Sequence, residues 1–226
     1  AAGGLWPEAP GLAASPLMGV SFVEFFAIGP ALPASLERLR LLVERHVARD
    51  VRDAGVVLGV QPHAPYSVAM EGYRAAIELA RLHGLPLCTH LAESPEEAEF
   101  IAHARGPQRE LLESLNLWSG AVAAEFGRGL SPISHLASAL REGVRLAVHV
   151  NQASDEDLRL LAACGTTVAY CPRASAYFRA HESFGSHRYR EMLEAGVRVV
   201  LGTDSILNLR VDEASPRMGT LEDMRL

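Results

Sequence analysis

Leu87-Cys88-Thr89-His90-Leu91-Ala92-Glu93 reads as a short buried strand that runs out into a loop. His90 and Glu93 stand at its end, three residues apart. An imidazole can bind a divalent metal, and a carboxylate can carry a proton. The alternative is a core histidine bonded to a carbonyl group, with Glu93 merely preceding the helix that Ser94 begins.

Three other segments have the same form, an apolar run that ends in a polar residue suited to chemistry: Val56–His63, Arg145–His149 and Val197–Asp204. In a parallel β/α barrel, active-site residues come from the carboxyl ends of several strands. Each ending also has a purely structural explanation: a stiff turn around His63, a satisfied buried His149, and an Asx turn or helix cap at Asp204. One such ending is weak evidence, but four of the same kind predict a single catalytic rim.

The rest of the chain alternates strands and helices. Apolar runs typical of buried strands occur at Val20–Ile28, Val56–Val60, Leu85–Thr89, Arg145–Val150, Thr166–Tyr170 and Val197–Leu201. Helical patterns separate most of them, for example the helix start Ser94-Pro95-Glu96-Glu97. This rhythm predicts an α/β fold with a parallel sheet. An open doubly wound sheet is an alternative, but no Gly-x-Gly-x-x-Gly follows a strand, and the polar endings are spread over four strands.

We therefore expect a (β/α)8 TIM-type barrel that is incomplete here. A closed barrel usually needs about 250 residues. Six strand-helix units fill the 226 residues of this chain, which corresponds to about strands 3 to 8. Residues 1–226 are expected to form a single partial barrel domain. Because the chain starts at Ala1 and stops within a helical pattern at Leu226, we expect it to be part of a longer protein.

The composition excludes several kinds of chemistry and partner. All 21 basic residues are arginine, so this chain offers no lysine for a Schiff base, a phosphate loop or a carbamylated bridge between two metals. The net charge of −6 argues against nucleic acid as a partner. Three cysteines without a Cys-x-x-Cys pair predict free thiols and a cytoplasmic location. No apolar run is long enough to cross a membrane, and a homo-oligomer is compatible with the sequence.

The segment that follows Cys171-Pro172-Arg173 reads as a long loop at the catalytic face. A guanidinium group suits the recognition of anionic or polar groups. Arg173 is therefore a candidate substrate-binding residue.

These motifs resemble those of the amidohydrolase superfamily, in its cytosine/guanine deaminase and chlorohydrolase-like branch. The resemblance rests on Pro62-His63-Ala64-Pro65-Tyr66, Thr89-His90-Leu91-Ala92-Glu93, Val148-His149-Val150, Cys171-Pro172-Arg173 and Leu201-Gly202-Thr203-Asp204-Ser205. Their order and separations look like that branch from about residue 20 to the end of the chain.

The resemblance implies a barrel that holds one divalent metal, zinc in the first place and iron as the alternative. His90 and Asp204 match metal-binding positions, and Glu93 matches the proton shuttle. His149 matches the catalytic histidine beside the hydrolytic water, and His63 matches a substrate contact. Asp204 would also take a proton from that water. The implied reaction is hydrolysis of a C–N bond other than a peptide bond, most simply deamination of an aminated heterocycle or cyclic amidine.

One departure from the family pattern is the absence of a His-x-His pair, which in the family supplies two further metal ligands from the first strand. That pair, the first strands and a flanking β-sandwich are expected outside this chain. Two alternatives stay open: a chlorohydrolase or amide hydrolase using the same site, and a non-catalytic fragment or binding module. The small-molecule partner is common to the enzymatic alternatives, and two ligands alone predict weak or no metal binding by the isolated chain.

Overall fold

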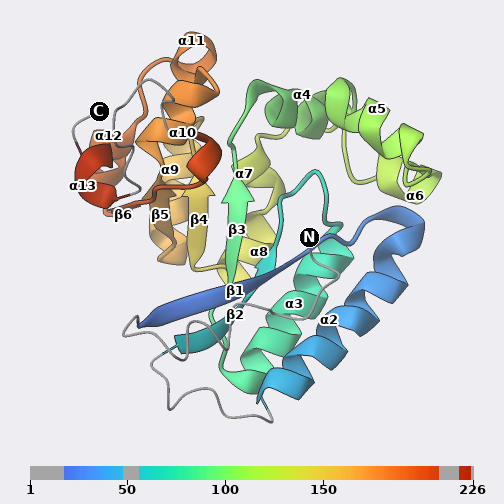
Figure 1. The fold of residues 1–226 in the computed structure, drawn as a ribbon. Coiled ribbons are helices and arrows are strands. Elements are labelled where there is room, and N and C mark those ends of the chain that lie inside the picture. The colour runs from blue at the N-terminus through green and yellow to red at the C-terminus, as the bar shows by residue number, and fades with distance from the viewer. Residues whose placement is uncertain (1–17, 48–55, 209–218, 225–226) are drawn as a thin grey trace.

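The computed structural model describes residues 18–47, 56–208 and 219–224. Six parallel strands lie in these ranges, and they follow one another in sequence order (Figure 1). They are β1 (Gly19–Phe25), β2 (Val56–Pro62), β3 (Cys88–Leu91), β4 (Leu146–His149), β5 (Thr167–Tyr170) and β6 (Arg198–Leu201). Strands β1 and β2 pair along their full length, with Glu24 opposite Gln61, and β3 to β6 form a four-stranded sheet.

The two sheets join where β2 approaches β3. Val60 and Leu87 form a parallel bridge, and the Val60 N–H donates to the Pro86 carbonyl over 2.9 Å. The His90 N–H donates to the His63 carbonyl over 2.9 Å, so the carboxyl ends of the two strands are side by side. Consecutive parallel strands in sequence order confirm the predicted α/β fold of the barrel type.

Helices connect the strands and pack against one another around them. They are α2 (Leu32–Val47), α3 (Met70–His83), α4 (Pro95–His103), α5 (Pro107–Ser114), α6 (Gly120–Ala123), α7 (Pro132–His135), α8 (Ala137–Glu142), α9 (Asp155–Cys164), α10 (Pro172–Tyr177), α11 (Ala180–Phe184), α12 (Tyr189–Glu194) and α13 (Thr220–Asp223), with 3-10 turns η1 (Gly29–Ala31) and η3 (Ile206–Asn208). Contacts run in series from α2 to α3, α8, α9 and α12. Within the described ranges, no helix has the length and apolar character needed to span a membrane.

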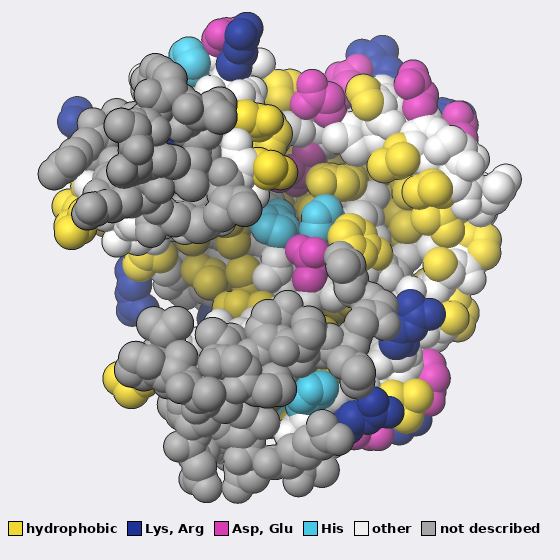
Figure 2. Space-filling view, in the orientation of Figure 1, with side chains coloured by type: hydrophobic (Ala, Val, Ile, Leu, Met, Phe, Trp, Pro, Cys, Tyr) yellow, Lys and Arg dark blue, Asp and Glu magenta, His cyan; other side chains and the backbone are white. Residues whose placement is uncertain are grey.

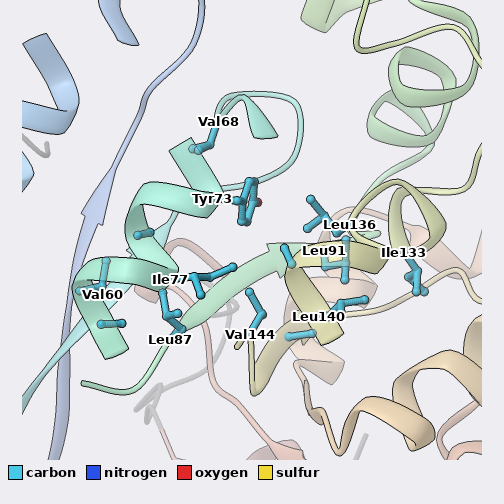
Figure 3. Packing of buried hydrophobic residues seen from close by; sticks show 14 of the residues in the cluster. Val60, Val68, Tyr73, Ile77, Leu87, Leu91, Ile133, Leu136, Leu140 and Val144 are labelled. Atoms are coloured by element: carbon cyan, nitrogen blue, oxygen red, sulfur yellow. The ribbon is translucent and has the colours of Figure 1, made fainter. Parts of the chain in front are cut away.

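The main core lies between the sheet and α3 and α8 (Figure 3). Leu91 of β3 and Leu87, which directly precedes that strand, pack there with Ile77 of α3 and Leu140 of α8. Burying a leucine side chain stabilises the fold by about 1.5–3 kcal/mol. Because side chains alternate along a strand, the burial of Leu91 against the helices turns His90 toward the opposite face of the sheet.

Helix α3 begins at Met70 and not at Ser67. Ser67 is a good helix start by residue type, but its hydroxyl donates to the Ala64 carbonyl over 3.1 Å and lies 2.7 Å from His63 Nδ1. The helix begins at Met70, whose N–H is capped by Glu125 Oε2 at 2.9 Å. A carboxylate 55 residues away in the sequence therefore caps this helix.

The segment after Cys171 is not the long loop that the sequence predicts. It forms α10 and α11, which have six and five residues. Pro172 stands at the start of α10, and Arg179, with a φ of 53°, separates the two helices. Helices this short show too little periodicity to be recognised from sequence.

Candidate metal and catalytic site

His90 projects from the end of β3 with 21% of its side chain exposed. Its Nδ1 lies 3.1 Å from the carbonyl oxygen of His63. A carbonyl only accepts hydrogen bonds, so we assign the proton to Nδ1, which leaves the lone pair of Nε2 for a ligand. A backbone carbonyl that fixes the tautomer in this way is typical of metal-binding histidines.

His63 follows β2 and has its ring held in a similar way. The Ser67 hydroxyl donates to Ala64, so it accepts from His63 Nδ1–H over 2.7 Å. The Phe26 ring lies against it, with centroids 4.4 Å apart. Burial, and then the nearby His90, lower the pKa of His63 to about 4. The imidazole is therefore neutral at pH 7 and presents a free Nε2 lone pair.

Glu24 is a member of this cluster that the sequence reasoning missed. Its Oε1 lies 3.7 Å from His90 Nδ1 and accepts from the Gln61 amide over 3.1 Å. Glu24, His63 and His90 each offer a ligand atom within 4.8 Å of the other two. The available signal was a carboxylate inside the apolar Phe- and Val-rich run of β1, placed beside Gln61 by strand register. Two imidazoles and a carboxylate form a donor set that suits zinc or iron.

His149 and Glu93 form the second half of the site. His149 Nε2 lies 3.4 Å from Glu93 Oε1, and the His149 ring stacks on the His90 ring with centroids 5.5 Å apart. Only 1% of the His149 side chain is exposed. Burial first, and then the neighbouring histidines His90 and His187, lower its pKa to about 3. His149 is therefore a neutral imidazole, and its Nδ1 has no hydrogen-bond partner among the described residues.

The pKa of Glu93 is raised above its ordinary value. Burial is the main cause, the charge of Asp204 adds to it, and His90 acts in the opposite direction. A partly buried carboxyl group with a raised pKa keeps its proton to a higher pH than an exposed one, which suits a role in proton transfer.

Asp204 stands after β6 in a left-handed backbone conformation, with a φ of 55°. Its carboxylate is exposed, and its Oδ2 accepts from the Asn208 amide over 2.6 Å. Asp204 comes three residues after Leu201, the last residue of β6, and so lies at the carboxyl end of the sheet. Burial first, and then the charge of Asp204, raise the pKa of the Cys171 thiol.

Arg173 lies on α10 and is buried rather than displayed on a loop. Its Nε lies 3.6 Å from Oδ1 of Asp223, whose side chain is fully buried. The Arg173 guanidinium is thus turned toward Asp223.

The structure gathers His63, His90, Glu93 and His149 into one cluster. Histidine and acidic side chains gather in a hollow at the centre of the face drawn in Figure 2.

A partial parallel barrel with imidazoles and carboxylates at its carboxyl rim defines a class of metal-dependent hydrolases. Residues 13–226 match the Amidohydrolase family, and this chain belongs to that family.

Proteins named as deaminases resemble the chain over most of its length. The aminodeoxyfutalosine deaminase of Deinococcus radiodurans is 29% identical over an alignment of 191 residues that covers 80% of this chain and 44% of that protein. The crystal structure of Helicobacter pylori aminofutalosine deaminase with methylthio-coformycin matches with a TM-score of 0.69 and 24% identity, over 87% of this chain and 46% of that one. An adenosine deaminase from Xanthomonas campestris with bound zinc matches with a TM-score of 0.62 and 18% identity, over 87% of this chain and 38% of that one. The chain therefore spans less than half the length of these proteins.

Proposed function

We propose that this chain is the catalytic barrel portion of a metal-dependent hydrolase that acts on C–N bonds other than peptide bonds. The proposed reaction is hydrolytic removal of the amino group from an aminated heterocycle. The observation that carries the proposal is the convergence of His63, His90, His149 and Glu93 at the carboxyl ends of β2, β3 and β4. The similar proteins named above support it, since all three are named as deaminases.

The proposed cofactor is one divalent ion, zinc or else iron. His90 and Asp204 are the family-type ligands, and the Glu24 carboxylate is a further candidate donor, because the ligand atoms of Glu24, His63 and His90 lie within 4.8 Å of one another. When bound, such an ion lowers the pKa of a water molecule toward about 7. The structure thus offers more donors than the two that the sequence predicts, so we expect measurable binding by this chain.

The other candidate side chains have proposed roles in proton transfer and in substrate binding. Glu93 accepts a proton from the attacking water and passes it to a ring nitrogen of the substrate, which its raised pKa permits. Neutral His149 donates a hydrogen bond to the charge that develops at the reacting carbon. His63 contacts the substrate through Nε2. Asp204 accepts the second proton of the water and passes it to the departing amino group, which leaves as ammonia. Arg173 stays a prediction as a substrate contact, although its Nε lies 3.6 Å from Oδ1 of Asp223.

The aromatic rings of the site also indicate the form of the substrate. We propose a small, planar aminated ring because the cluster is built from stacked and tilted aromatic rings, including Phe26 over His63.

Free Cys88, Cys164 and Cys171 support a cytoplasmic location of the protein as part of this proposal.

The proposal is tested on the full-length protein that contains this chain. Metal content is measured by mass spectrometry, and ammonia release is measured with a panel of aminated purines, pyrimidines and their nucleosides. A chlorinated triazine and an acyclic amide serve as the comparison substrates. Bound zinc or iron with ammonia release supports the proposal. A metal-free protein, or one that releases only chloride or cleaves only the amide, overturns it.

A further inference from the structure

The loop that carries Glu93 contains an unfavourable backbone conformation, which other residues must stabilise. Strand β3 ends at Leu91, and Ala92 then adopts a φ of 52°, which is unusual for a residue with a side chain. Such a conformation costs about 1 kcal/mol or more and persists only where its surroundings fix it. The direction of the Glu93 side chain depends on this turn.

Glu97, on the first turn of α4, binds the N–H groups of the turn. Its side chain is fully buried, its Oε1 accepts from the Ala92 N–H over 2.9 Å, and its Oε2 accepts from the Glu93 N–H over 2.8 Å. The sequence pattern marks Glu97 only as a helix-capping residue, since Ser94 Oγ accepts from the Glu97 N–H. The carboxylate instead reaches beyond the cap to both N–H groups that precede it.

Asn151, two residues after His149, binds the carbonyl groups of the same turn. Its N–H donates to the Ala92 carbonyl over 2.9 Å, and its side-chain amide donates to the Glu93 carbonyl over 2.9 Å. The Ser175 hydroxyl on α10 donates to Asn151 Oδ1 over 2.6 Å and fixes the orientation of that amide.

All four backbone polar groups of Ala92 and Glu93 are thus bonded, two by Glu97 and two by Asn151. The turn of the proton-carrying residue is also tied to the strand end that bears His149. We propose that Glu97 and Asn151 are positioning residues that hold the Glu93 carboxylate against His149, with Ser175 orienting Asn151. This inference rests on the proposed function for the part of it that concerns catalysis.

The test compares Glu97→Gln with Glu96→Gln, a neighbouring exposed glutamate on the same helix turn. Glutamine keeps the shape of Glu97 but turns an NH2 group toward one of the two N–H donors. We expect Glu97→Gln to lower kcat for amino-group release about 10- to 100-fold with KM changed less than about threefold, because a small misplacement of a catalytic group costs about this much. Glu96→Gln leaves both unchanged.

The decisive measurement repeats Glu97→Gln in a Glu93→Gln background. A positioning residue acts through Glu93, so the double variant is no slower than Glu93→Gln alone. If the two losses multiply, Glu97 does not act through Glu93 and the inference is wrong. Ser175→Ala is the milder second variant should Glu97→Gln fail to fold, and its smaller loss in kcat also disappears in the Glu93→Gln background.

A readout that needs no activity separates this inference from the proposed function. Hydrogen exchange at the Ala92 and Glu93 amides is faster in Glu97→Gln than in wild type, while exchange in α9 is unchanged. If wild type releases no ammonia but Glu97→Gln shows the faster exchange at both amides, the positioning role of Glu97 stands and the proposed function fails. If exchange at both amides is the same in Glu97→Gln as in wild type, the positioning role of Glu97 is wrong, whatever the activity.

Discussion

His149 Nε2 lies 3.4 Å from Glu93 Oε1, although the two residues lie at the ends of different strands and are 56 positions apart in the sequence. The pKa of the imidazole is lowered by its burial, and the pKa of the carboxyl group is raised by its own. Opposite shifts in adjoining groups are typical of sites that transfer protons.

Glu93→Gln is predicted to lower kcat by about 10²- to 10⁴-fold, because the amide cannot transfer the proton. Metal content is expected to stay at the wild-type level, since Glu93 is outside the group formed by Glu24, His63 and His90. Steady-state kinetics and metal analysis on the same preparation check both parts. A fully active Glu93→Gln protein would remove Glu93 from the mechanism.

Glu24→Gln is predicted to weaken zinc binding about 10- to 100-fold, which is the usual loss when a supporting ligand or its partner is removed. The amide is a poorer metal donor and also changes the contact with Gln61. Competition with a chromophoric chelator measures the affinity. Glu44→Gln, an exposed glutamate on α2, is the control, and equal affinities of the two variants would contradict a role for Glu24.

His135→Phe is predicted to make the protein less sensitive to acid. The His135 ring stacks on Phe126 with centroids 5.3 Å apart, and burial lowers its pKa to about 4. An unfolded histidine takes up its proton near pH 6.5. The stability from neutral His135 is therefore present above about pH 6.5 and is lost as the pH falls toward 4, on the order of 1–3 kcal/mol. Urea unfolding at pH 7.5 and pH 4.5 measures the difference, with exposed His103→Phe as the control; a loss as large in His135→Phe as in wild type would refute the prediction.

Arg173→Gln is predicted to destabilise the protein by about 3–5 kcal/mol, because it leaves the carboxylate of Asp223 buried without its cationic partner. Adding Asp223→Asn to Arg173→Gln is expected to restore part of that stability. Glu182→Gln, in the exposed pair with Arg179, should have little effect. If Arg173→Gln raises KM without changing urea unfolding, Arg173 serves the substrate and not the fold.

The strand ends at His63, His90, His149 and Asp204 could be predicted from sequence because the signal is local. An apolar run followed by a polar residue depends only on neighbours along the chain, and parallel strands then bring their carboxyl ends together. The same reasoning could not find Glu24. Its place beside His90 depends on the pairing of β1 with β2 and of β2 with β3, which no local pattern specifies.

The sequence by itself determined the order of strands and helices, the barrel class and the set of residues able to do chemistry, since periodicity and residue type are written along the chain. Only the tertiary structure decided the partners of those residues: Glu24 beside His90, Asp223 against Arg173, and Glu97 and Asn151 on the turn of Glu93. Those contacts join segments distant in sequence, and they exist because packing the helices on the sheet buries polar groups that must then bond to one another.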